Sequence, residues 1–256
     1  MKRVKRRTFS GAVCEQEVFT IRENQNMKSA EPRQPRFLSD ADRAAHREAI
    51  SRKRHTQLFN TNFSPASLYS TLTLDNENEV HEYEEMKRLR DNYMRRLQRR
   101  FPDAVIFAYI GRGKNTHRMH MHMVSSGIPA EVIKEQWKYG SVTRIENLRE
   151  HNVYDGIDCG ADYTGLANYL FDHWKPEYGG HRYKYTRNAL QPEKEEAKEI
   201  KRAYSETKPP AAPKGYKLVE TRTNKYGYLY FKYVKIPESR YMTRKRKKRE
   251  GQISFI

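Results

Sequence analysis

The chain has 256 residues, with 50 lysines and arginines against 32 aspartates and glutamates, which gives a formal net charge of +18. So large a basic excess predicts a polyanionic partner, with nucleic acid as the first expectation and an anionic membrane surface as its competitor. No apolar run approaches the about 18 residues that a membrane-spanning helix needs, and no signal-peptide pattern follows the basic start. We therefore expect a cytoplasmic protein that does not cross a membrane.

Two cysteines, Cys14 and Cys159, are too few for a disulfide framework and match no CxxC metal spacing. We expect both thiols to be reduced. Apolar residues make up 36% of the chain, with 18 tyrosines and 10 phenylalanines, which is enough to fill one core of ordinary size. The remaining length then belongs to extensions around that core.

The first 65 residues are polar and basic and contain only short apolar runs, which predicts an extension packed onto the core. Part of it, residues 39–54, is expected to be helical with Ser39 or Asp40 as its cap. Residues 68–74 combine β-branched and aromatic residues at a period of two, which predicts a strand. From 79 to 101, apolar residues recur every three or four positions, with acids first and arginines last, which indicates an amphipathic helix.

The most informative segment alternates histidine with methionine. It follows residues 104–110, a strand that is apolar on both faces and should therefore be central in its sheet. Side chains two apart on a strand share a face, so His120 and His122 point together while the methionines beside them point to the other side. Two imidazoles on one face can hold a divalent metal. The spacing alone is weak evidence, because two half-exposed strand histidines would have the same pattern.

Downstream, the pattern changes several times. The predicted elements are a short helix (129–137), a strand (141–148), a helix with tyrosines (162–174), a charged helix (193–206), a proline-rich linker (208–215) and a hairpin (216–236). A basic tail with six consecutive bases, Arg244–Arg249, ends the chain. The expected division is an extension (1–65), a core domain (66–192), a helix, linker and hairpin (193–236) and the tail (237–256).

The order of these elements, with three short motifs, resembles the His-hydrophobic-His (HUH) endonucleases, and within them the rolling-circle replication initiators of plasmids, phages and Gram-positive mobile elements. The motifs are Tyr69–Thr73, His120–Val124, and Leu166–Leu170 followed by Arg187–Pro192. Each motif is weak alone, whereas their order and separations together are specific. The resemblance covers roughly residues 66–192.

The resemblance implies an α/β (α+β) domain with a mainly antiparallel, ferredoxin-like or RRM-like sheet, the histidines on a central strand and a catalytic tyrosine on a downstream helix. It implies site-specific nicking and joining of single-stranded DNA, in which a tyrosine hydroxyl attacks a phosphodiester and stays attached to the 5′ end. Tyr169 matches the position of this nucleophile. The implied cofactor is Mg²⁺ or Mn²⁺ held by His120 and His122, and imidazole ligands suit Mn²⁺ better. Tyr163 is the nearest rival, but six residues along a helix turn it to a different face.

One departure from the family pattern concerns the positive charge near the nucleophile. Many relatives carry a lysine three residues after the tyrosine, where this chain has Asp172. Lys175 is therefore the predicted catalytic cation, with His173 as the alternative.

A second departure concerns the third metal ligand. Relatives often add an acidic or amide ligand from the strand before the histidines, and residues 107–113 contain no acid. We choose Glu146 on the next strand as this ligand, with His117 and Asp103 as alternatives. His117 has an odd spacing from His120, which places it on the opposite face unless the strand begins after it.

Six basic residues near the motifs are predicted to contact DNA: Arg112, Lys114, Arg118, Arg182, Lys184 and Arg187. The first three flank the histidines. The other three interleave with Tyr183 and Tyr185, a mixture that suits single strands because cations follow the phosphates while rings stack on bases.

The predicted function is that of a rolling-circle replication initiator acting on origin DNA. Because the chain has no GxxxxGK[ST] helicase motif, unwinding and synthesis are expected to come from a host helicase and polymerase. A mobilisation relaxase or a single-tyrosine transposase shares the chemistry. An alternative of another class is a catalytically silent nucleic-acid-binding protein, which the two departures favour. The origin sequence and the oligomeric state do not follow from the sequence.

Overall fold

The computed structural model describes residues 1–33, 39–113, 117–174 and 181–237. The chain is an α+β protein, and every strand pair among these residues is antiparallel. It divides into two compact units. We call the first the terminal unit (1–48, 151–162 and 192–256) and the second the histidine unit (49–150 and 163–191). No helix within the described ranges is long and apolar enough to cross a membrane.

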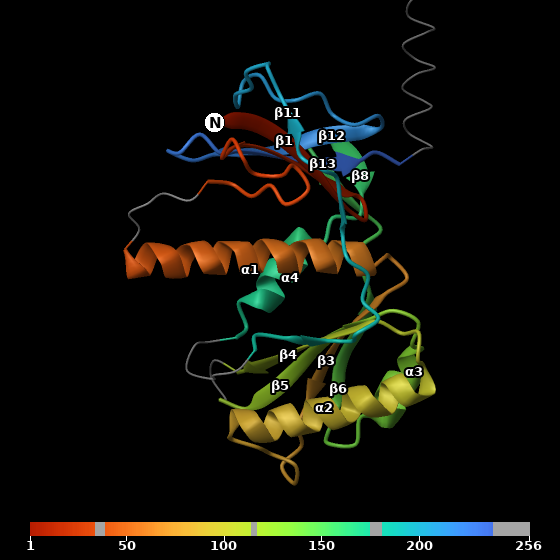
Figure 1. The fold of residues 1–256 in the computed structure, drawn as a ribbon. Helices are drawn as coiled ribbons and strands as arrows, with labels where there is room; N and C mark the ends of the chain where they lie inside the picture. Colours follow the sequence, from red (N-terminus) through yellow and green to blue (C-terminus); the bar gives the residue numbers. More distant parts are fainter. Residues whose placement is uncertain (34–38, 114–116, 175–180, 238–256) are drawn as a thin grey trace, which may run out of the picture. The chain divides into compact units, whose positions relative to one another are not determined.

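The terminal unit is built from strands that lie far apart in the sequence (Figure 1). They are β1 (Lys2–Ser10), β2 (Val13–Ile21), β7 (His151–Tyr154), β8 (Ile157–Gly160), β10 (Glu193–Lys194), β11 (Lys198–Glu199), β12 (Tyr216–Thr223) and β13 (Leu229–Lys235). β2 pairs with both β1 and β13, so the first residues of the chain share a sheet with the C-terminal hairpin. That hairpin, β12–β13, was expected over 216–236 and is confirmed. Both cysteines are free thiols, as expected, and both are buried.

The charged helix expected over residues 193–206 is wrong. Glu193–Lys194 and Lys198–Glu199 are instead short strands that pair with β1. The segment has many charges but no continuous apolar stripe, so helix formation would bury little surface. Pairing with β1 satisfies its backbone groups and lets Ala197 join the apolar cluster around Val4 and Phe19.

The histidine unit contains one five-stranded sheet with helices on both faces (Figure 1). Its elements are the second part of α1 (Asp40–Asn62), β3 (Leu68–Thr73), α2 (Tyr83–Arg100), β4 (Ile106–Arg112), β5 (Met119–Ser125), α3 (Ala130–Gln136), β6 (Val142–Asn147), α4 (Thr164–Phe171) and β9 (Lys184–Tyr185). The strand order is β6-β3-β5-β4-β9, which places the histidine strand β5 at the centre.

α2 and α3 cover the methionine face of this sheet. The three methionines of β5 pack with Met86, Tyr93 and Leu97 of α2 in one buried cluster that also takes in Ile133 of α3. Each fully buried side chain of this kind contributes about 1.5–3 kcal/mol to folding. The amphipathic helix expected over 79–101 is therefore confirmed, although it begins at Tyr83.

The opposite face, which we call the histidine face, packs against residues 49–62 of α1 and against α4. Phe63, just after α1, lies 5.1 Å from the Phe107 ring of β4, centroid to centroid. Asn60 ties α4 in place, because its amide accepts a hydrogen bond from the Tyr163 backbone at 2.8 Å and donates to the Thr164 hydroxyl at 3.2 Å. α4 is thus confirmed but shorter than the expected 162–174.

The start of α1 also agrees with the sequence. The Ser39 hydroxyl accepts a hydrogen bond from the Asp42 backbone at 3.1 Å, while the Asp42 carboxylate accepts one from the Ser39 hydroxyl at 2.8 Å. This reciprocal arrangement is a helix cap, so Ser39 is the capping residue. The helix continues to Asn62, eight residues beyond the expected end at 54, because its last turns bury His55, Leu58 and Phe59.

Candidate metal centre

His120 and His122 project from the centre of the sheet. β5 hydrogen-bonds to β3 on one side and to β4 on the other, and its residues alternate between the two faces. Because its methionines are buried in the core cluster under α2 and α3, the two histidines must point away from that core. They share one face, as expected.

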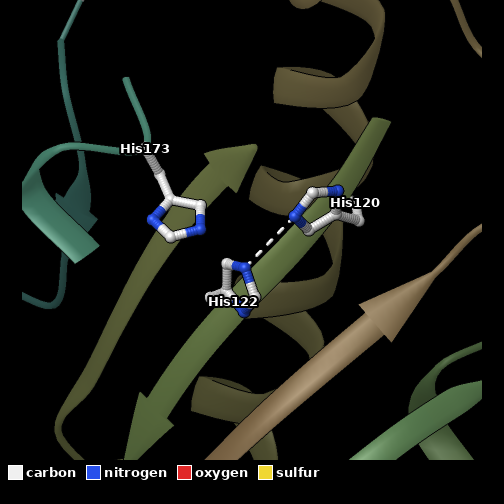
Figure 2. Close-up of side chains that lie close together, drawn as sticks. All are labelled: His120, His122 and His173. Carbon is white, nitrogen blue, oxygen red and sulfur yellow. Dashed lines mark hydrogen bonds between the residues drawn. The ribbon is translucent and has the colours of Figure 1, made fainter. Parts of the chain in front are cut away.

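The two imidazoles face each other through their Nε2 atoms, which lie 3.1 Å apart (Figure 2). Two nitrogens that each lie about 2.1 Å from one ion are roughly 3.0–3.4 Å apart for bond angles between about 90° and 109°. The spacing of these two nitrogens is therefore that of two ligands of one metal ion.

A third imidazole comes from His173, which follows α4. One ligand nitrogen from each of His120, His122 and His173 lies within 4.8 Å of the others. The His173 ring centroid is 4.5 Å from that of His122 and 6.2 Å from that of His120, and Figure 2 shows the three rings converging. From the sequence, His173 was expected only as a source of positive charge. The structure places it with the other two histidines.

Each ring is also held from its other side. The His122 Nδ1 is 2.7 Å from the Tyr69 hydroxyl and 3.2 Å from that of Thr71. The His173 Nδ1 donates to the Tyr169 backbone carbonyl at 2.8 Å, and His120 is hydrogen-bonded to the Arg118 backbone. Metal-binding histidines in proteins have this arrangement, in which the outer ring nitrogen is fixed by a neighbour and the inner one faces the ion.

The protonation of the strand histidines suits ligation. Burial, together with the neighbouring rings of His173 and His120, lowers the pKa of His122 to about 3. Burial also lowers the pKa of His120. Neutral imidazole is the form that binds metals, so both side chains are ready to act as ligands at neutral pH.

Space for an ion between the rings depends on Gly111 of β4. Gly111 is the residue directly opposite His120 in the β4–β5 pair. A Cβ at this position would lie 2.7 Å from His120 Nε2, closer than real Cβ atoms approach other atoms, and 3.0 Å from His173 Cδ2, which is tighter than most Cβ contacts. The missing side chain thus leaves open the space into which the ligand nitrogens point. Three imidazoles, their outer partners and this opening fit a divalent transition-metal ion.

Tyr169 stands beside the histidines on α4. Its ring centroid is 4.4 Å from that of His173 and 6.2 Å from that of His122. The side chain is 53% exposed, so a substrate can reach its hydroxyl. The predicted nucleophile and the predicted metal-binding histidines are therefore brought together.

Tyr163 lies elsewhere. It precedes the first residue of α4, is 4% exposed and donates its hydroxyl to the Arg149 backbone carbonyl at 3.0 Å. Burial raises the pKa of its phenol to about 12. The two tyrosines occupy different surroundings, and only Tyr169 faces the histidines, but Tyr163 lies before α4 and not on another face of the helix as expected.

Of the positions expected to supply a catalytic cation, Lys175 lies outside the described residues. Asp172, at the position where the HUH resemblance led us to expect lysine, pairs with Arg52 of α1 at 2.6 Å. This hydrogen bond holds the pKa of Asp172 below its usual value. The Arg52 guanidinium also lies over the Phe171 ring, 4.7 Å from its centroid. Arg52 of α1 therefore places a positive charge beside the position at which the HUH pattern has lysine.

None of the three residues expected as a third ligand, two acids and one histidine, belongs to this cluster. Glu146 pairs with Arg144 at 2.7 Å, and Asp103 is exposed in the turn before β4. His117 is exposed, has a φ of 54° and precedes the first residue of β5, so it does not share the histidine face. Within the described ranges, the third histidine of the metal-capable group is His173.

The predicted DNA contacts are dispersed. Arg118 pairs with Glu79 at 3.0 Å, Arg112 donates to the His81 carbonyl at 2.6 Å, and Lys184 pairs with Asp91 of α2 at 2.7 Å. These three are thus engaged on the α2 side of the unit.

The remaining predicted contacts are Arg182, Arg187 and Lys114. Arg182 lies at the end of α4, where its guanidinium is 4.4 Å from the Phe171 ring centroid and 4.7 Å from that of Trp174. Arg187 is exposed, and Lys114 lies outside the described residues.

The sequence did not reveal which residues the strands beside β5 contribute to the site. The roles of Gly111 and Tyr69 depend on strand register, which no spacing along the chain gives. The signal for His173 was present, because it lies four residues after Tyr169 and therefore follows it on the same side of a helix.

A comparison of the chain with known protein families, with curated proteins and with solved structures finds no match.

Proposed function

We propose that the chain is a metal-dependent enzyme that nicks and rejoins single-stranded DNA, with Tyr169 as its nucleophile. The observation that carries the proposal is the exposed tyrosine whose ring stands against the three-histidine cluster. An exposed phenol beside a metal-binding group is what phosphodiester transfer to tyrosine requires. The net charge of +18 supports a nucleic acid as the substrate.

The reaction exchanges one phosphodiester for another. The Tyr169 oxygen forms a bond to phosphorus as the bond from phosphorus to the 3′ oxygen of the preceding nucleotide breaks. The phenolic proton is lost, the departing 3′ oxygen takes up a proton, and the 5′ end of the DNA stays on the tyrosine. Rejoining reverses these steps with a 3′ hydroxyl as the attacking group.

His120, His122 and His173 would hold the ion. When bound, it would polarise the phosphate and offset negative charge in the transition state. A ligand set of three imidazoles without a carboxylate favours Mn²⁺ over Mg²⁺, because imidazole suits softer ions. Tyr69 and Thr71 keep the His122 ring in the orientation that directs its Nε2 inward.

With this chemistry, an HUH-type replication initiator is the biological role that we propose. The ferredoxin-like description of the sheet, origin DNA as the substrate in the cytosol, and a host helicase and polymerase as partners belong to the same proposal. The exposed tyrosine favours an enzyme over a silent DNA-binding protein, which would not need a reachable hydroxyl at this place.

The test is a covalent adduct. Wild-type protein with Mn²⁺ and a labelled single-stranded origin fragment should form a complex that survives denaturation and carries the fragment whose 5′ end the cut creates. Tyr169→Phe removes one oxygen and should form none, while His120→Ala and His122→Ala should lose the adduct and keep most of their DNA affinity.

Two tyrosine variants serve as controls. Tyr226 is exposed to the same extent as Tyr169, 53%, so Tyr226→Phe should retain full activity. Tyr163→Phe tests the rival nucleophile and should retain most activity. Loss of the adduct in Tyr163→Phe alone would move the nucleophile to that residue. Absence of an adduct from wild type with any divalent ion would favour the silent DNA-binding protein.

A further inference from the structure

Arg144 of β6 stands in the same row of the sheet as the metal-binding histidines. Thr71 of β3 is paired with His122 on one side and with Arg144 on the other. Directly opposed residues of antiparallel strands project from the same face. The row His122–Thr71–Arg144 therefore lies on the histidine face, with Arg144 on the edge strand.

The arginine is directed along this face by two contacts. Its guanidinium carbon lies 5.6 Å from the centroid of the Tyr69 ring, whose hydroxyl contacts His122. Its Nη2 also lies 2.7 Å from the carboxylate of Glu146, two residues further along the same strand. Glu146 thus holds an arginine of the histidine face.

The neighbours of Arg144 favour the charged form of its guanidinium. The pKa of Arg144 is raised first by its hydrogen bond to Glu146, then by the charge of that carboxylate, and further by the phenols of Tyr69 and Tyr169. The side chain is 60% exposed, so several of its five N–H donors remain available to a ligand.

We propose that Arg144 binds the scissile phosphate next to the Tyr169 hydroxyl, and that Glu146 is the residue that positions it. The inference rests on the proposed function and names the group of this chain that contacts the substrate's phosphate. A guanidinium offers paired donors that match two phosphate oxygens and stays charged at every physiological pH. It can therefore stabilise the negative charge that builds on these oxygens as the tyrosine attacks.

The experiment compares two arginine variants that change the net charge equally. Arg144→Gln should slow single-turnover adduct formation by about 100-fold, the effect of removing one donor to a developing oxyanion. Arg95→Gln is the matched control, because Arg95 is exposed on α2, which covers the opposite face of the sheet. It should leave the rate unchanged. Both variants should bind Mn²⁺ as wild type does, and Arg144→Lys should recover part of the rate.

A neutral phosphate identifies the contact. A methylphosphonate at the mapped cleavage position removes one phosphate charge, so wild type and Arg144→Gln should then react at similar rates. Glu146→Gln should slow adduct formation less than Arg144→Gln and leave Mn²⁺ affinity unchanged. An Arg144→Gln rate equal to that of Arg95→Gln would overturn the proposal, and so would a parallel loss of Mn²⁺ affinity in Arg144→Gln or in Glu146→Gln.

The failure of the underlying function is a separate result. Wild-type protein that forms no adduct at all overturns the nicking activity and the role of Arg144 together. Wild-type protein that forms the adduct while Arg144→Gln forms it equally fast overturns only the role of Arg144.

Discussion

At the scale of single residues, the candidate metal centre depends on Gly111, because glycine has no side chain to fill the space between the rings. Gly111 has no atom beyond its backbone where His120 and His173 converge, and the atoms that an added Cβ would meet first belong to these two rings. Rings at the ends of side chains can move, whereas backbone cannot. A substitution at this position should therefore disturb the site more than the fold.

Gly111→Ala should lower Mn²⁺ affinity by about 10–100-fold, the usual effect of displacing groups that orient metal ligands. The midpoint of thermal unfolding without metal should change little. A titration with Mn²⁺ and a thermal scan measure the two quantities. Gly165→Ala on α4 is the control, because nothing lies within 4 Å of an added Cβ there. It should leave Mn²⁺ affinity unchanged and stabilise the helix by about 0.5–1 kcal/mol. Wild-type affinity in Gly111→Ala would mean that the ion does not occupy this opening.

The hydroxyl of Tyr69 also shapes the candidate metal centre, although it is not a ligand. It is hydrogen-bonded to Nδ1 of His122, and the Thr71 hydroxyl lies within hydrogen-bond distance of the same nitrogen. The first motif of the sequence thus supports the second through side-chain hydrogen bonds between neighbouring strands. Phenol and imidazole also stack, with ring planes 15° apart, which limits rotation of the His122 ring.

At the scale of elements, α4 and the residues just after it contribute both of the groups that complete the site. Tyr169 lies near the end of the helix and His173 just beyond it, where the His173 ring bonds back to the Tyr169 carbonyl. Asn60 of α1 fixes the start of this helix. One short element therefore sets the position of the proposed nucleophile and of the third imidazole together.

His173→Ala should weaken Mn²⁺ binding by at least about 100-fold, because a ligand contributes more than the partners that orient it. His46→Ala, which removes an exposed histidine from α1, is the matched control and should bind Mn²⁺ as wild type does. Isothermal titration of both variants gives the comparison. If His173→Ala bound Mn²⁺ normally and Glu146→Ala did not, the ligand assignment from the sequence would be restored.

Several elements follow directly from local pattern. The amphipathic spacing of 79–101 gives α2, and the alternation of histidine and methionine gives β5 with its two unlike faces. The helix predicted over 193–206 is not formed. Two short segments of this region pair with the edge of β1 as strands instead. Local propensity is a small free energy, and pairing with an available edge exceeds it.

At the scale of the whole molecule, buried histidines make stability depend on pH. His55 of α1 is fully buried and contacts the Tyr109 hydroxyl at 2.7 Å. Burial, together with the charge of Arg52, lowers the pKa of His55 from 6.5 to about 3. The folded protein therefore binds no proton at this ring in a range where the unfolded chain does.

The sign of the effect follows from proton binding. The contribution of His55 is fully present above pH 6.5 and is lost as the pH falls from 6.5 toward about 3, because the unfolded chain takes up the proton. Within this window the loss approaches about 1.4 kcal/mol per pH unit. Denaturant unfolding between about pH 4.5 and 6.5, above the range in which most carboxylates titrate, should show this slope.

His55→Gln should reduce the dependence of unfolding free energy on pH by about one proton relative to wild type. The variant will also be less stable at neutral pH, since the Tyr109 hydroxyl loses its partner. The slope is therefore the informative quantity, not the absolute stability. An unchanged slope would mean that His55 is protonated in the folded protein or does not titrate in this window.

The sequence by itself determined the charge and the elements whose burial is periodic. It also determined that His120 and His122 share a face, because side chains two apart on a strand project together, whereas Tyr169 was chosen from the resemblance to the HUH endonucleases. The tertiary structure decided that His173 completes the cluster, that Gly111 leaves the space, and that Glu146 holds Arg144. These relations cross from strand to strand and from helix to sheet, and the register that creates them is set by packing of the whole unit, which local sequence does not encode.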